Sequence, residues 1–225
     1  MKIVIASSKD WFFKKTKLMN HKELDIELIK SKNKLNMSNL KKLNPKYIFF
    51  PHWNWKVSSD ILINFECIAF HTAPLPYGRG GSPLQNLIIR GFREAPLCAL
   101  KMTDEIDGGP IYMKKNISLE GSLEQIFSRI SIVSQEMIFE ICHNKVEPKK
   151  QEGEIYFFKR LSHKDNELNF DLSFEKIYDQ IRMLDADEYP KAFVNLGNFK
   201  IEFTNASYDN DELKANVRFI KKESS

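Results

Sequence analysis

The feature that most constrains the fold of this chain is the alternation of short apolar runs with amphipathic stretches through its first hundred residues. The runs at 2–6, 25–29 and 47–50 have the length of strands, and amphipathic stretches at 11–19 and 35–43 separate them. This alternation is typical of an α/β protein, with a mainly parallel twisted sheet that carries helices on both faces. The sequence therefore predicts a Rossmann-like architecture.

The same pattern continues to about residue 150. The elements expected there are helices at 58–64, 82–90 and 122–143, and strands at 67–71, 94–102 and 111–119. Ligands in such folds bind beyond the carboxyl ends of the strands. We therefore expect the residues that follow positions 50, 70 and 102 to meet at one edge of the sheet.

The chain changes character after residue 150, where it becomes polar and irregular before a helix at 173–184 and short strands at 193–220. We therefore divide it into a main domain, 1–150, and a linker with a small α+β subdomain, 151–225. The 34 Lys and Arg against 30 Asp and Glu give a net charge of only +4, without charge blocks. That balance argues against a nucleic-acid partner.

Several absences point to the cytoplasm. The amino terminus lacks the basic head and cleavage site of a signal peptide, and no run approaches the roughly 20 apolar residues of a membrane span. Three widely spaced cysteines are expected as buried free thiols, and the five histidines show no metal-ligand spacing. We expect a cytoplasmic protein with no membrane contact and no metal.

Two segments hold the residue types that chemistry needs. In the segment 70–83, His71 stands at a strand end and is followed by a proline-stiffened turn and a glycine-rich bend. In the segment 104–110, carboxylates precede a rigid Gly-Gly-Pro turn. Alone, a strand-end histidine is as often structural, and the second segment also suits a solvated hairpin turn. Together they place an imidazole near a carboxylate.

The two segments, FHTAPLPYGRGGSP and DEIDGGPIY, resemble the core of the formyl-tetrahydrofolate-dependent formyltransferases. That family includes methionyl-tRNA, glycinamide ribonucleotide and nucleotide-sugar N-formyltransferases. The resemblance covers roughly residues 45–195 and includes Lys159-Arg160 of the family's linker region. It implies 10-formyltetrahydrofolate as formyl donor, with His71 as base and Asp107 as the residue that orients it. It also implies a folate-contacting turn made by Ala73, Pro74, Leu75 and Pro76.

The chain departs from the family at Ala69, where the family has an asparagine that holds the formyl oxygen. Loss of such a donor typically costs about a hundredfold or more in rate. We expect His52 or Asn54 to replace it, although both also suit plain structural roles. Protonated His71 is a further candidate for that role. The pterin is expected between residues after Phe50 and the 102–107 turn, at Pro51, Trp53, Met102, Asp104 and Ile106.

The amine acceptor is expected to be an amino sugar carried on UDP or dTDP. Only about 35 residues follow Pro190, which argues against tRNA, whereas the linker and extra strands are foreign to the glycinamide ribonucleotide enzymes. Another small amine, or an inactive folate-binding relative, remains an alternative. By analogy a homodimer is expected. The candidate substrate contacts are Tyr77, Arg79, Gly80, Gly81, Ser82 and Arg182.

Overall fold

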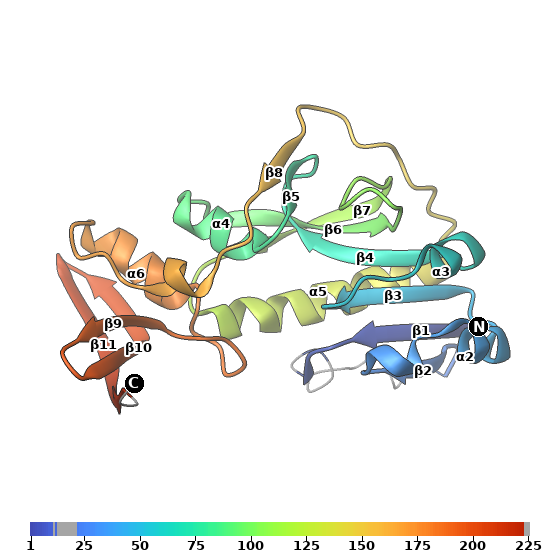
Figure 1. The fold of residues 1–225 in the computed structure, drawn as a ribbon. Helices are drawn as coiled ribbons and strands as arrows, with labels where there is room; N and C mark the ends of the chain where they lie inside the picture. Colours follow the sequence, from blue (N-terminus) through green and yellow to red (C-terminus); the bar gives the residue numbers. More distant parts are fainter. Residues whose placement is uncertain (11, 13–21, 223–225) are drawn as a thin grey trace.

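The structure is a computed structural model of the chain, and it describes residues 1–10, 12 and 22–222. Its centre is a six-stranded sheet in the order β2-β1-β3-β4-β6-β7 (Figure 1). Strands β1, β2, β3 and β4 pair in parallel. Strand β6 pairs antiparallel with β4, and β7 pairs antiparallel with β6. The strands are β1 (Lys2–Ser7), β2 (Asp25–Ile29), β3 (Tyr47–His52), β4 (Cys67–Thr72), β6 (Glu94–Lys101) and β7 (Ile111–Ser118).

Both faces of the sheet are covered. Ile3 and Ile5 of β1 pack in the core cluster that contains the long helix α5 (Leu123–His143). Val4 and Ala6 point the other way, into a cluster with α2 (Met37–Leu43) and α3 (Ser59–Asn64). A strand buried on both faces has no polar side, which explains why β1 reads as an unbroken apolar run. The expected α/β fold is confirmed.

Helix α5 begins where the sequence provides a capping box. The Ser122 hydroxyl accepts from the Gln125 backbone N–H at 3.3 Å, and the Gln125 side chain accepts from the Ser122 N–H at 3.0 Å. These bonds satisfy two of the amide groups that a helix start leaves free. The apolar face of α5 then runs along the sheet, with Ile126, Ile130 and Ile138 buried.

The chain after α5 returns across the main sheet before it forms the carboxy-terminal unit. Strand β8 (Tyr156–Phe158) pairs in parallel with β5 (Tyr77–Gly80), which precedes the short helix α4 (Pro83–Ile89). Helix α6 (Phe174–Arg182) then packs beside a three-stranded antiparallel sheet at one end of the molecule (Figure 1). That sheet consists of β9 (Ala192–Leu196), β10 (Phe199–Asp209) and β11 (Glu212–Lys221).

The small α+β appendage is therefore present, whereas the division at residue 150 stays a prediction. The helix expected at 11–19 falls almost wholly outside the described residues. Cys67, Cys98 and Cys142 are free and buried, as predicted. Burial raises the pKa of the Cys67 thiol to about 12 and those of Cys98 and Cys142 to about 11.

Among the helices that the structure describes, none has the length and apolar character needed to cross a membrane.

Candidate active site

A cavity of about 840 Å³ opens beyond the carboxyl ends of β3 and β4. Its walls come from residues 50–55, 69–72 and 80–85, from the loop after β6, from α5, and from the segment 158–166. The end of β3 and the end of β4 thus meet at one edge of the sheet, as expected for parallel neighbours. In the described part of the chain, no group of three or more His, Cys, Asp or Glu side chains is placed to hold a metal ion.

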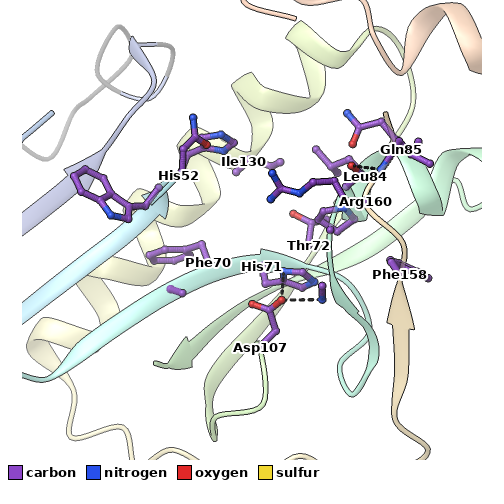
Figure 2. A pocket seen from close by; sticks show the side chains of 18 of the residues that line it. His52, Phe70, His71, Thr72, Leu84, Gln85, Asp107, Ile130, Phe158 and Arg160 are labelled. Carbon is purple, nitrogen blue, oxygen red and sulfur yellow. Dashed lines mark hydrogen bonds and ion pairs between the residues drawn. The ribbon is translucent and has the colours of Figure 1, made fainter. Parts of the chain in front are cut away.

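The cavity contains a close pair formed by His71 and Asp107 (Figure 2). Nδ1 of His71 lies 3.5 Å from Oδ2 of Asp107, and Nε2 lies 2.7 Å from the backbone oxygen of Gly78. A carbonyl oxygen only accepts, so Nε2 carries a proton. Nδ1 faces the carboxyl group of Asp107. The imidazole is thus held between a backbone carbonyl and a carboxyl side chain.

Asp107 reaches His71 by a different route from the one the sequence suggests. Strand β6 runs antiparallel to β4, so its last residue, Lys101, pairs with Ile68 at the far end of β4. The prediction that the carboxyl ends of both strands share an edge was therefore wrong. The loop after β6 instead folds back along the sheet and brings Asp107 to the cavity.

Backbone contacts hold the Asp107 loop in this position. The Gly80 amide donates to Oδ2 of Asp107 at 2.9 Å, and the Gln151 side chain donates to the Asp107 carbonyl at 2.7 Å. Asp107 has φ of 51°, a left-handed conformation that aspartate adopts more readily than most residues. Gly109 packs so closely that a Cβ there would lie 1.8 Å from the Lys101 oxygen.

His52 and Asn54, the proposed substitutes for the family asparagine, both line the cavity, as does Ala69 itself. Burial is the main cause that lowers the pKa of His52 to about 4, and the charge of Lys9 lowers it further, against the opposing effects of Glu188 and a hydrogen bond with Asn54. His52 is therefore neutral near pH 7 and retains one N–H donor. Figure 2 shows His52 across the cavity from His71.

Four of the residues expected to contact folate line one wall of the cavity, namely Pro51, Trp53, Met102 and Ile106. The rings of Trp53 and Trp55 meet edge to face with centroids 4.8 Å apart. Nε1 of Trp53 is buried and has no hydrogen-bond partner among the described residues. The two indole rings give the cavity an aromatic wall, which suits a flat heteroaromatic ring.

Other predicted contacts do not reach the cavity. Ala73 and Leu75 of the proline-stiffened turn are buried in a small apolar cluster with Cys98. Tyr77 stacks on Tyr156 with ring centroids 5.0 Å apart, on the β5–β8 ribbon. The predicted site residues that the structure leaves outside the cavity lining are Ala73, Pro74, Leu75, Pro76, Tyr77, Arg79, Asp104 and Arg182.

Both arginines predicted to contact the substrate are engaged within the protein. Arg79 forms an ion pair with Glu105 and donates to Gln151 from two of its nitrogens. Arg182 is only 2% exposed, pairs with Asp179 at 2.6 Å and donates to the backbone oxygens of Leu119 and Gly121. These two predictions need correction, because both guanidinium groups stabilise the fold instead of facing a ligand.

The glycine-rich bend also differs from expectation. Gly80, Gly81 and Ser82 line the cavity, but the Gly80 amide is bonded to Asp107 and the Gly81 amide to the Phe158 oxygen at 3.2 Å. Their N–H groups therefore hold neighbouring segments together and are not free for a ligand. Helix α4 spans only seven residues, so we assign no anion site to its amino terminus.

Sequence reasoning gave no site role to several residues of the cavity wall. Distant segments contribute them: α4, α5, the start of the carboxy-terminal unit, and the chain just after β8. They include Gln85, Phe127, Arg160, His163 and Tyr189. The only signal for Arg160 was the motif Lys159-Arg160, and this motif does not indicate where the residue lies relative to the cavity.

Comparison with known proteins places this site in context. The sequence profile of the methionyl-tRNA formyltransferase C-terminal domain matches residues 163–220. A methionyl-tRNA formyltransferase from Clostridium thermocellum is 42% identical, with a TM-score of 0.94 over 98% of this chain and 99% of that one. The methionyl-tRNA formyltransferase of Thermodesulfovibrio yellowstonii is 30% identical over 151 residues, 64% of this chain and 49% of the relative. The chain thus spans about half the length of the curated relatives it matches.

A 4-N formyltransferase from Francisella tularensis has a similar fold, with 15% identity and a TM-score of 0.65 over 100% of this chain and 98% of that one. At this identity the likeness concerns the fold alone. The much stronger match to the Clostridium thermocellum protein runs through nearly the whole of both chains. The predicted family is confirmed: this chain belongs to the formyltransferase family.

Proposed function

We propose that this protein transfers a formyl group from 10-formyltetrahydrofolate to a primary amine bound in the cavity. The observation that carries the proposal is the His71–Asp107 pair, 3.5 Å apart at the floor of a cavity large enough for two organic molecules. Family membership supports the reaction type. Ligand cavities of enzymes commonly measure about 300–1,000 Å³.

The reaction requires a proton acceptor and a partner for a developing oxyanion. 10-Formyltetrahydrofolate supplies the formyl carbon. A bond forms between the amine nitrogen and that carbon, the bond from the carbon to N10 breaks, and the amine proton ends on N10. Asp107 is 21% exposed in its side chain against 8% for His71. We propose that the amine proton passes to the pair through Asp107, while Gly78 fixes the imidazole.

This assignment modifies the roles expected from the family. His71 has both ring nitrogens occupied, by Gly78 and by Asp107, so it acts as part of the pair and not as a separate base. An imidazolium beside the reacting carbon also stabilises the negative formyl oxygen. Because His52 lies across the cavity, we favour His71 over His52 or Asn54 as the replacement for the missing asparagine (Figure 2).

For the acceptor we propose an amino sugar linked to a nucleoside diphosphate. The cavity supports this choice because it has a small-molecule volume, an aromatic wall suited to rings, and a guanidinium for phosphate. Methionyl-tRNA is the second candidate, favoured by the 42% identical relative and by the matched profile at 163–220. A small-molecule acceptor needs few cations, whereas tRNA binding rests on many phosphate contacts.

A formylation assay with separate acceptors tests the proposal. Purified protein is incubated with 10-formyltetrahydrofolate and UDP- or dTDP-linked 4-amino sugars, other small amines, or methionyl-tRNA, and products are identified by mass. We expect a gain of one formyl group on a nucleotide-linked sugar. Formylation of methionyl-tRNA alone would overturn the acceptor assignment. Folate binding without transfer to any amine would instead identify a non-catalytic relative.

The catalytic pair is tested with His71→Gln and Asp107→Asn. Each removes the shared proton, so we expect turnover to fall by about 10²- to 10⁴-fold while 5-formyltetrahydrofolate still binds. Because the residues act as one unit, the double variant should be little worse than either single one. Independent, additive losses would show that the two residues do not share a proton.

A further inference from the structure

We infer that Arg160 is the anion-binding residue of the acceptor half of the cavity and that its guanidinium binds the phosphate group of the amine-bearing substrate. The inference rests on the proposed function for its choice of ligand. Arg160 thus takes the role that the sequence suggested for Arg79 and Arg182, whose guanidinium groups form ion pairs within the protein.

The backbone around Arg160 is fixed against the start of α4. Asn86 donates from its side chain to the Lys159 oxygen at 2.9 Å, and the Leu161 amide donates to the Ser82 hydroxyl at 3.1 Å. The Gly81 amide bonds to the Phe158 oxygen. Hydrogen bonds on both sides of residue 160 therefore define where its side chain begins.

Gly81 makes this close approach sterically feasible. A Cβ at position 81 would lie 2.5 Å from the Arg160 Cβ and 2.7 Å from its Cα, closer than real side chains pack. The absence of a side chain at 81 thus allows residue 160 to lie directly against the bend. From there the Arg160 side chain points into the cavity, between His52 and His71 (Figure 2).

The charge of Arg160 is not neutralised by the protein. Among the described residues it forms no ion pair and no hydrogen bond from its guanidinium, and it is the only Lys or Arg in the cavity lining. Asp107 is the one carboxylate in that lining and is bonded to Gly80. A guanidinium left with free N–H donors in a cavity is a site for bidentate binding of phosphate or carboxylate.

Two anions are available in the proposed reaction, the phosphate of the acceptor and the glutamate carboxylates of the folate. Position favours the acceptor. Trp53 lies just after β3, and Met102 and Ile106 lie in the loop after β6, whereas Arg160 follows β8 and lies beside α4. Folate bound at the first wall leaves the Arg160 side to the second substrate.

Calorimetric titration tests the inference without requiring turnover. Wild-type protein, Arg160→Ala, Arg160→Lys and the control Lys159→Ala are titrated with dTDP, UDP and, separately, 5-formyltetrahydrofolate. Lys159→Ala removes the same charge from the adjacent, exposed position outside the cavity. We expect Arg160→Ala to weaken nucleotide binding about ten- to a hundredfold, Arg160→Lys to restore part of it, and Lys159→Ala to change little.

The folate titration separates the two sources of anion. Unchanged 5-formyltetrahydrofolate affinity in Arg160→Ala supports the acceptor assignment, and a loss confined to the folate overturns it. Equal losses of nucleotide affinity in Lys159→Ala and Arg160→Ala also overturn it, because they would show that only the overall positive charge matters. Thermal unfolding of each variant verifies the fold. Nucleotide binding that depends on Arg160 stands even if no acceptor is formylated, so this result is independent of the proposed reaction.

Discussion

At the scale of single residues, the cavity contains two histidines with opposite surroundings. Nε2 of His71 lies against the Gly78 carbonyl oxygen, and Nδ1 faces the Asp107 carboxyl group. His52 is desolvated and close to Lys9, which lowers its pKa to about 4 and favours the neutral ring. The same residue type therefore lies beside a carboxyl group on one wall and is a desolvated, neutral ring on the other.

The lowered pKa of His52 predicts a stability effect with a defined sign. The unfolded chain takes up a proton at this imidazole below about pH 6.5, whereas the folded protein does so only near pH 4. Stability from this group is full above about pH 6.5 and is lost as the pH falls towards 4. Between about pH 7 and pH 4.5 we expect a loss of about 1–3 kcal/mol, measured by urea unfolding.

His52→Gln is the matched control for this measurement, because glutamine does not titrate. The difference in unfolding free energy between wild type and His52→Gln should shrink or reverse as the pH falls. A difference that stays constant over this pH range would contradict the neutral buried assignment.

At the scale of elements, the sequence predicts the centre of the sheet well because β1 and β3 are buried on both faces. Residues 2–6 and 47–50 read as strands since their apolar runs are too short for helices, and α5 is evident from its periodic apolar residues. The direction of β6 was not predictable from pattern alone. An apolar strand has the same composition whether it runs parallel or antiparallel to its neighbour.

The site was predictable only where a local motif carries it. His71 and Asp107 each stand in such a motif, whereas Arg160 and Phe127 reach the cavity through packing between distant elements. The arginines at 79 and 182 were misassigned because an unpaired guanidinium and a buried, paired one look alike in sequence. Pairing is a property of the folded chain.

The close contact between Gly81 and the Arg160 backbone leads to a testable prediction. Gly81→Ala places a methyl group against the Arg160 backbone and should displace the segment after β8. We expect dTDP affinity to fall about tenfold or more, as with Arg160→Ala, while the His71–Asp107 pair remains. Calorimetry measures the affinity.

The control for this variant is Gly91→Ala. Gly91 has φ of 81° but no neighbouring atom within 4 Å of an added Cβ, so alanine there adds backbone strain without a clash. Its stability should fall modestly and its dTDP affinity should not change. Equal affinity losses in both variants would mean that general destabilisation, and not the displacement of Arg160, is responsible.

At the scale of the whole molecule, Arg182 ties the carboxy-terminal unit to the main sheet. It connects α6 to the backbone of residues 119–121, just before α5, and shares Asp179 with Arg93. Gln85 adds a second tie by donating to the Met183 oxygen at 3.2 Å. The homodimer and the cytoplasmic location expected from sequence stay predictions.

Arg182→Ala should therefore lower stability and leave ligand binding intact. Loss of the guanidinium leaves buried acceptors and part of the Asp179 charge unpaired, which costs about 3–5 kcal/mol. Urea unfolding measures the loss, and dTDP calorimetry at low temperature tests the remaining folded protein. A loss of affinity in folded protein without a loss of stability would restore Arg182 as a substrate contact.

The return of the chain across the sheet after α5 has a consequence for how the protein is made. Synthesis proceeds from the amino terminus, so His71 and Asp107 leave the ribosome well before Arg160 and Tyr189. The part of the cavity wall that contains Arg160 and Tyr189 is therefore added last, against a His71–Asp107 pair that is already present. An unfinished chain thus lacks a complete cavity, and the full lining forms only when the late segment docks.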